Sequence, residues 1–240
     1  MRILVTRPKQ AAERTAARLD ALGQEVLIAP VLEITATGAV PPAKTFDGTL
    51  VTSAEAIARL DRATTSALRT LPMFVVGERT AKAAVAAGFA DVRTVATDAQ
   101  QLGETIISEF HDRTQWLYLA GRNRKPHLET ALVASGCSVE TIIVYEARPV
   151  ASLPLLARKA LREGRIDAVL HYSRRSATIL RDLAAAAGLS EAARRPIHLC
   201  ISEDTAAALR EWAPRIASAE APNEASMMAA TTKLCAALGG

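Results

Sequence analysis

Residues 2–34 read RILVTRPKQAAERTAARLDALGQEVLIAPVLEI, and residues 116–147 read WLYLAGRNRKPHLETALVASGCSVETIIVYEA. Both stretches run from a short apolar segment through an arginine-containing turn and a helical pattern to a glycine and a second apolar segment. The helical patterns predict helices over 9–22 and 126–135, closed by Gly23 and Gly136, because glycine accepts the left-handed conformation that ends a helix. We call this recurring pattern module A.

A second pattern, module B, recurs in three pieces that keep the same order. FDGTLVTSAEAIARL (46–60) matches IDAVLHYSRRSATIL (166–180), PMFVVGERTAKAAVAAG (72–88) matches PIHLCISEDTAAALREWA (196–213), and TDAQQLGETI (97–106) matches PNEASMMAAT (222–231). The chain therefore contains the modules in the order A, B, A, B. Such a repeat predicts two similar domains of roughly 115–120 residues each.

Strands and helices alternate in both modules. The strands that we expect at 49–52, 74–76, 117–119 and 168–170 are apolar on both faces. This pattern is typical of parallel strands covered by helices on both sides. The sequence therefore predicts two doubly wound α/β domains.

Two pairings of the modules are open. Each A can pack with the B that follows it, or the first A can pack with the second B and leave the middle of the chain as an inserted domain. The apolar ends at 30–34 and 142–147 both lead into proline-containing segments, 38–42 and 149–154. Because both modules A lead into similar segments, we expect two linkers that run side by side. This favours the second pairing, in which the first A packs with the second B.

Composition and charge exclude several classes of protein. Of the 240 residues, 50% are hydrophobic and 22% charged, which argues against disorder. We expect no membrane span, because no segment approaches the length of uncharged apolar residues that a span needs, and no secretory segment, because only a run of three apolar residues precedes Arg7 and Lys9. The three cysteines are far apart and odd in number, so we expect a reduced, cytoplasmic protein. The net charge of +4 favours anionic partners only mildly, and few aromatic side chains are present to stack bases, so we expect no nucleic-acid partner.

Several motifs are missing. The sequence has no GxGxxG after a strand, no GxxxxGK[ST], no HExxH and no GxSxG. Its four histidines, His111, His127, His171 and His198, share no spacing that suits metal ligands. We therefore expect neither a metal nor a nucleotide cofactor.

Hydroxyls and cations follow the strands, at the starts of the predicted helices. Ligands of an open parallel sheet bind at the carboxyl ends of the strands, where free N–H groups of helix starts attract anions. Each Ser or Thr there also suits a simple N-cap, and each Arg suits a solvated surface charge. However, an arginine near a helix start opposes the helix dipole, so five of them at corresponding turns indicate a polyanionic ligand. These arginines are Arg7, Arg122, Arg124, Arg174 and Arg175.

Tyr145 stands where the first module A has Leu32. It suits a core aromatic residue with its hydroxyl at the rim, or a phenol that acts as a proton donor. Of the neighbours His171 and Tyr172, only one can face the ligand side, because successive side chains of a strand alternate.

The sequence resembles the uroporphyrinogen-III synthase family over nearly its whole length. The segments that carry the resemblance are ILVTRP (3–8), FDGTLVTSAEAI (46–57), VVGERTAKAAVAAGF (75–89), LAGRNRKPHLETAL (119–132), IIVYEARPV (142–150), HYSRRSATIL (171–180) and APNEASMMAA (221–230). The resemblance implies two flavodoxin-like domains, joined by a two-stranded linker, with a cleft between them. Residues 1–34 and 149–240 would form the first domain and residues 35–148 the inserted second one.

The resemblance also implies an activity. Family members are lyases that cyclise hydroxymethylbilane, a linear tetrapyrrole with eight carboxylates, with loss of water and inversion of ring D, and they use no cofactor or metal. The implied partner is this small molecule. A transient contact with the preceding enzyme of the pathway, which would hand over the substrate, is also expected. From the residues alone, a non-catalytic two-domain binder of a polyanionic small molecule stays an alternative.

The resemblance assigns roles to particular residues. Tyr145 would assist the loss of the ring A hydroxyl. The hydroxyls that line the family's cleft correspond to Ser53, Thr80, Ser173 and Thr205, and its polar turns correspond to Thr6, Arg7, Arg122 and Lys125. The turn before Thr205 departs from the family pattern, because Glu203 and Asp204 stand where a glycine-containing turn is usual. These two acids would repel carboxylates.

Overall fold

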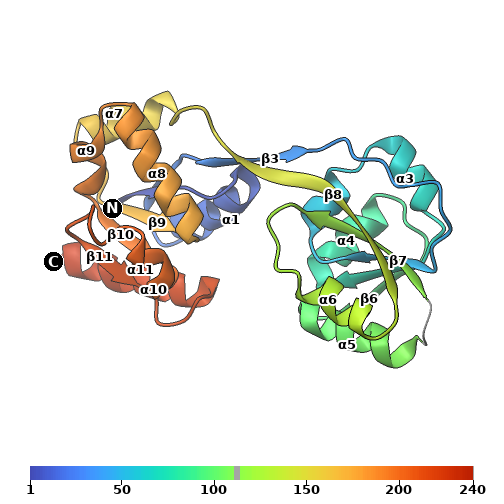
Figure 1. Cartoon of the computed structure of the whole chain (residues 1–240). Helices are drawn as coiled ribbons and strands as arrows, with labels where there is room; N and C mark the ends of the chain where they lie inside the picture. The colour runs from blue at the N-terminus through green and yellow to red at the C-terminus, as the bar shows by residue number, and fades with distance from the viewer. Residues whose placement is uncertain (111–113, 240) are drawn as a thin grey trace. The chain divides into compact units, whose positions relative to one another are not determined.

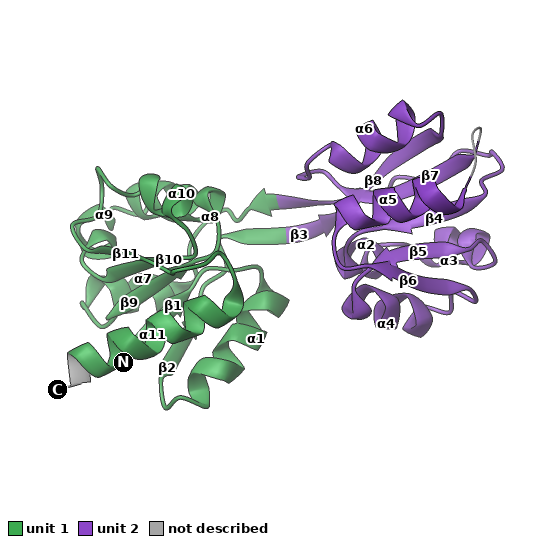
Figure 2. Ribbon diagram, turned by 90° about the horizontal axis from the view of Figure 1, so that it is seen from below, with its two compact units in different colours: residues 1–33, 148–240 green, residues 34–147 purple. Residues whose placement is uncertain are grey.

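The computed structural model describes residues 1–110 and 114–239. Two compact units make up the chain, and Figure 2 shows them in different colours. Unit 1 contains Met1–Glu33 and Arg148–Gly240, and unit 2 contains Ile34–Ala147. No helix in the described part of the chain has the length and apolar composition of a membrane span.

Unit 1 is a parallel sheet of five strands in the order β2-β1-β9-β10-β11, of which Figure 1 labels β9, β10 and β11 and Figure 2 labels all five. Its strands are β1 (Arg2–Val5), β2 (Glu25–Ile28), β9 (Ala168–His171), β10 (Ile197–Cys200) and β11 (Ile216–Ser218). Its helices are α1 (Lys9–Asp20), α7 (Leu155–Arg162), α8 (Arg174–Ala186), α9 (Ser190–Arg194), α10 (Glu203–Ala207) and α11 (Glu224–Gly239). Helices α1 and α11 pack on one face of the sheet, through Leu19 and Met227, and α8 and α10 pack on the other, through Ala177 and Ala206.

Unit 2 is a sheet of six strands in the order β3-β8-β7-β4-β5-β6. Its strands are β3 (Leu32–Ala36), β4 (Gly48–Val51), β5 (Met73–Val76), β6 (Val92–Ala96), β7 (Gln115–Gly121) and β8 (Ser138–Pro149). Its helices are α2 (Ala54–Ala58), α3 (Arg62–Leu68), α4 (Glu78–Ala86), α5 (Ala99–Glu109) and α6 (His127–Ala134). The apolar side chains of α2, α3 and α4 fill the core on one face, and those of α5 and α6 fill it on the other. The predicted α/β class with parallel sheets is confirmed.

The sequence repeat also appears in the order of the strands. The strands of module A are β1 and β2 in unit 1 and β7 and β8 in unit 2, whereas module B supplies β9, β10 and β11 or β4, β5 and β6. The orders β2-β1-β9-β10-β11 and β8-β7-β4-β5-β6 are then the same order of corresponding strands. Unit 1 contains the first module A and the second module B, and its order 2-1-3-4-5 is that of a flavodoxin-like sheet.

The chain passes between the units twice, once within β3 and once within β8 (Figure 2). These two strands are neighbours. The Thr37 amide donates to the Val144 carbonyl and the Val150 amide to the Val31 carbonyl, both at 3.1 Å. The domain assignment of residues 1–34 with 149–240 and of 35–148 stays a prediction.

The two helices expected around the glycines of module A are α1 and α6. They end at Asp20 and Ala134, slightly before the predicted ends at 22 and 135. The glycines that follow have φ angles of 72° for Gly23 and 89° for Gly136, in the left-handed region that other residues rarely adopt.

Candidate functional site at the carboxyl edges of the two sheets

The predicted site residues follow the ends of parallel strands. In unit 1, Thr6 and Arg7 follow β1, Ser173 follows β9, and Thr205 lies in the α10 turn after β10. In unit 2, Ser53 follows β4, Thr80 lies in the first turn of α4 after β5, Arg122 and Lys125 follow β7, and Tyr145 lies in β8. Parallel strands end at the same edge, so each set lies along the carboxyl edge of its own sheet. The strand order reverses between β1 and β9 and between β7 and β4, and such a switch point is where ligands of open α/β sheets bind.

The predicted hydroxyls divide into two kinds. Ser53 and Ser173 are N-caps, because their hydroxyls accept hydrogen bonds from the amides of Glu55 (3.2 Å) and Ser176 (3.1 Å). Thr6, Thr80 and Thr205 are buried. Thr6 donates its hydroxyl proton to the Leu170 carbonyl at 3.0 Å. The hydroxyls of Ser53, Ser173 and Thr6 therefore serve first to hold the strand–helix turns in place.

Ser202 is the cap of α10, a role that the sequence analysis did not assign. Its hydroxyl accepts a hydrogen bond from the Thr205 amide at 3.3 Å. A serine three positions before Thr205 is a sequence signal for such a cap.

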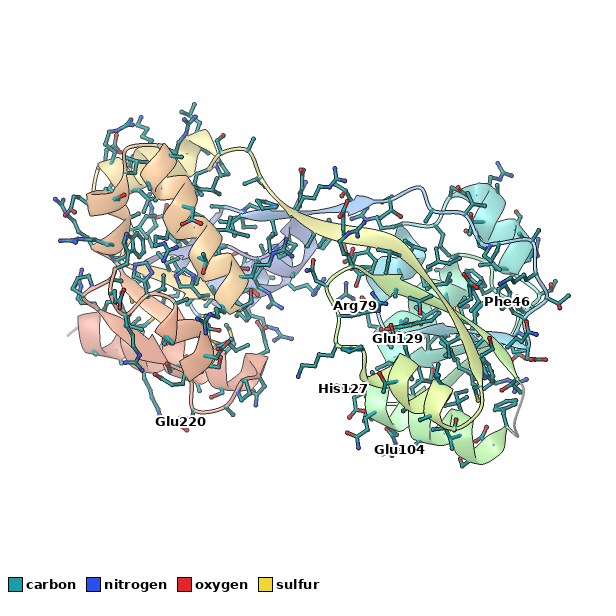
Figure 3. The ribbon with its side chains drawn as sticks, in the orientation of Figure 1. Phe46, Arg79, Glu104, His127, Glu129 and Glu220 are labelled. Carbon is teal, nitrogen blue, oxygen red and sulfur yellow. The ribbon has the colours of Figure 1, made fainter. Side chains whose placement is uncertain are left out.

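The predicted cations mostly pair with carboxylates of their own unit. Arg122 donates to Glu146 at 2.7 Å, Arg124 to Glu129 at 2.6 Å and Arg174 to Asp204 at 3.0 Å. Glu129, labelled in Figure 3, belongs to α6. Arg7 donates to Glu224 at 2.6 Å. A ligand carboxylate therefore has to compete with carboxylates of the chain for these arginines, whereas Lys125 is exposed in the turn after β7.

The half-buried Tyr145 ring lies against the backbone of Gly121 at the end of β7. A Cβ on Gly121 would come within 2.7 Å of the Tyr145 hydroxyl oxygen and 2.8 Å of its Cε2. The register between β7 and β8 shifts between Ala120 and Gly121, and the Arg122 amide donates to the Tyr145 carbonyl at 3.0 Å. Tyr145 also packs against the apolar core on the α2 and α4 face. Its ring position thus depends on the absence of a side chain at residue 121.

Gly121 is a residue that sequence reasoning missed. A glycine inside a strand marks a bulge or a close approach of another group. Its place at the end of an apolar strand, in the segment LAGRN, was therefore the available signal.

Replacing Gly121 with alanine is expected to move the Tyr145 ring, because the added methyl group would overlap the end of that ring, and to destabilise unit 2 by about 1 kcal/mol. Chemical denaturation would measure the first effect. Gly103→Ala is the matched control: it lies in α5, where an added Cβ would meet only Leu128 Cδ1, at 3.3 Å. Equal stability losses in the two variants would contradict the proposed packing of Tyr145 on Gly121.

The histidines of the described residues are not arranged for a metal. No group of three or more His, Cys, Asp or Glu side chains in residues 1–110 and 114–239 is arranged to hold a metal ion. His111 lies outside the described residues. His171 is fully buried and stacks on His198, and its neighbour Tyr172 instead lies beneath Arg7, whose guanidinium carbon is 3.9 Å from the centre of the Tyr172 ring. Of the two neighbours His171 and Tyr172, it is therefore Tyr172 that lies beside the candidate site residue Arg7.

The family model described as uroporphyrinogen-III synthase HemD matches residues 13–229. The chain belongs to the uroporphyrinogen-III synthase family. This family consists of lyase-type cyclising enzymes of tetrapyrrole biosynthesis, so the predicted family, enzyme class and activity are confirmed. No curated protein matches the chain.

A solved structure shows a similar fold. The uroporphyrinogen-III synthetase of Helicobacter pylori 26695 is 19% identical with a TM-score of 0.66, and the match covers 98% of this chain and 100% of that one. The wild-type uroporphyrinogen III synthase of Thermus thermophilus is 21% identical with a TM-score of 0.45, and the match covers 100% of both chains. The individual site residues stay predictions.

Proposed function

We propose that this synthase closes hydroxymethylbilane to uroporphyrinogen III with Tyr145 as the proton donor and with the two carboxyl edges as carboxylate-binding surfaces. The family match over residues 13–229 carries the activity. The residue roles are supported by the position of Tyr145 on Gly121, beside the switch point of unit 2.

The first step is the loss of the ring A hydroxyl. The Tyr145 phenol donates a proton to this hydroxyl, which leaves as water, and the substrate is left as a reactive azafulvene cation. This cation can close without help to the unflipped, type I isomer. The enzyme therefore has to hold ring D so that its substituted carbon attacks first and passes through a spiro intermediate. Positioning contributes more to this outcome than strong acid–base groups do.

The carboxylates of the substrate provide the means of positioning. The starts of α4 and α8 present backbone N–H groups at the carboxyl edges, and Ser173 fixes the start of α8 as its N-cap. Lys125 is exposed in the turn after β7, and Arg122, whose amide donates to the Tyr145 carbonyl, can exchange Glu146 for a carboxylate of the substrate. Ser53, Thr205 and Thr6 act in this scheme through the turns that their hydroxyls hold, and Thr80 acts as a buried residue in the first turn of α4.

A short-lived substrate also favours direct delivery. Because hydroxymethylbilane closes spontaneously, we propose that the enzyme that makes it hands it over in a transient contact. This proposal is independent of the residue roles given above.

One assay tests the activity. Freshly made hydroxymethylbilane is incubated with the protein, the product is oxidised, and the type I and type III porphyrins are separated. The proposal predicts mainly type III, against type I in a heat-denatured control. Only type I from a folded sample would refute it and would favour the non-catalytic binder of a polyanionic molecule.

A further inference from the structure

Glu224, the first residue of α11, receives hydrogen bonds from three side chains of unit 1. Its carboxylate accepts from Arg7 at 2.6 Å, from Tyr172 at 3.1 Å and from Thr15 at 3.2 Å. Arg18 lies 3.7 Å from the same carboxylate. The donors come from the turn after β1, from α1 and from the end of β9, so they gather at the switch point of this sheet.

These donors form a built site for a carboxylate. The fully buried Thr15 accepts a hydrogen bond from Arg7 at 3.0 Å, and the Arg7 guanidinium lies over the Tyr172 ring. Each of these contacts fixes the Arg7 guanidinium, which binds a carboxylate best when its geometry is fixed. The side chains of Arg7 and Glu224 are 24% and 28% exposed, so solvent and solutes reach the pair.

The start of α11 does not require Glu224. The Asn223 side chain already accepts a hydrogen bond from the Ser226 amide at 2.9 Å, as an N-cap does. In the matching segment of unit 2, Asp98 caps α5 in the same way, and the residue at the place of Glu224 is Ala99. Glu224 is therefore a carboxylate added to one copy of the repeat, at the place where cations gather.

We propose that Arg7, Thr15 and Tyr172 form a carboxylate-binding subsite, which Glu224 occupies in the free chain and which one acetate or propionate side chain of the substrate takes over when Glu224 is displaced. This inference rests on the proposed function for the identity of the ligand. Glu224 then acts as an internal competitor. It keeps the Arg7 guanidinium oriented before the substrate binds, and the free energy needed to displace it lowers the affinity for the substrate.

The test removes the charge of Glu224 but keeps the size of its side chain. We expect Glu224→Gln to lower both the Kd for uroporphyrin I, a stable octacarboxylate followed by its fluorescence, and the KM for hydroxymethylbilane by roughly fivefold. The control is Glu13→Gln, because Glu13 lies on α1 but pairs with Lys9 at 4.0 Å. It removes the same charge from the same unit and should change either constant less than about twofold.

A double-mutant cycle links the effect to Arg7. We expect Arg7→Gln to raise both constants, and Glu224→Gln to give no further gain in that background, since the competitor then has no site to block. Weaker binding by Glu224→Gln, equal gains from Glu224→Gln and Glu13→Gln, or the same gain without Arg7 would each overturn the inference.

The two proposals fail separately. Type III product with unchanged constants in Glu224→Gln would overturn the subsite and leave the activity standing. Type I product alone, with the expected pattern of uroporphyrin I binding, would overturn the activity and leave a carboxylate subsite.

Discussion

Replacing Tyr145 with phenylalanine is expected to lower kcat about 100-fold, because the variant keeps the ring on Gly121 and loses only the proton donor for the leaving hydroxyl. KM should stay nearly constant, since the carboxylate-binding groups are untouched. The slower enzyme competes less well with spontaneous closure, so the fraction of type III porphyrin should also fall without disappearing. Steady-state rates and separation of the porphyrin isomers measure the two effects.

The matched control is Tyr118→Phe. Tyr118 is buried in β7, and its hydroxyl is 2.9 Å from the hydroxyl of Thr52. Burial raises the pKa of Tyr118, so this phenol stays protonated and its role is a structural hydrogen bond. Its loss should cost about 1 kcal/mol of stability with little change in kcat. Full activity of Tyr145→Phe would rule out its phenol as the acid. An equal fall of kcat in both variants would mean that losing either hydroxyl has the same effect, so that Tyr145 has no special role as proton donor.

The fold was predictable because its signals are local. The apolar segments at 49–52 and 168–170 and the glycines at 23 and 136 need only their neighbours in sequence to predict a strand or the end of a helix. The repeat added the long-range information, since equal modules are expected to pack with equal strand order, and β2-β1-β9-β10-β11 matches β8-β7-β4-β5-β6.

The site was predictable as a region but not in its contacts. The sequence predicts the Thr6 hydroxyl to be a ligand-binding group of a turn. Thr6 is instead fully buried and bonds to the Leu170 carbonyl, because the pairing of β1 with β9 decides which way its side chain points. Arg7 and Glu224 are separated by 217 positions, and no spacing rule connects them. The glycine in LAGRN signals a close approach at residue 121, but identifying Tyr145 as the approaching group requires the register of β7 against β8, which shifts between Ala120 and Gly121.

Unit 1 is expected to lose stability as the pH falls below about 6.5, because it buries two histidines in their neutral form. His198 Nε2 donates to the Ala193 carbonyl at 3.1 Å, so its Nδ1 accepts a hydrogen bond from His171 Nε2 at 2.8 Å. His171 Nδ1 then has no proton and, among the described residues, no hydrogen-bond partner. A proton added to either ring would place a charge in the core.

The direction of the effect follows from the two pKa values. Burial, and next the charge of Arg215, lower the pKa of His198 to about 4, although its hydrogen bond to Ala193 opposes this. Burial and the neighbouring His198 hold the pKa of His171 well below its ordinary value of 6.5. Above pH 6.5 the folded and unfolded chains are both neutral at these rings. Below it, only the unfolded chain takes up protons, so by pH 4 His198 alone should cost about 3 kcal/mol of unfolding free energy.

The repeat supplies the variant that tests this pH dependence. Strand register places His171 and His198 where unit 2 has Val51 and Met73, which are buried in its core. His171→Val with His198→Met should therefore flatten the change in unfolding free energy between pH 7 and pH 4, even if the absolute stability shifts through the lost hydrogen bond to Ala193. Trp212, whose ring centre is 5.3 Å from that of His198, reports the unfolding of unit 1 by fluorescence in a Trp116→Phe background.

His127→Gln provides the control for the charge of a histidine as such. His127 is exposed on α6 of unit 2 (Figure 3), so its removal should leave the acid-induced loss in unit 1 as large as in the unmodified protein. If the double variant loses as much stability between pH 7 and pH 4 as the parent does, the buried pair is not the cause. Carboxylates that lose their ion pairs would then explain the acid sensitivity, since their protonation destabilises the folded state in the same direction but at lower pH.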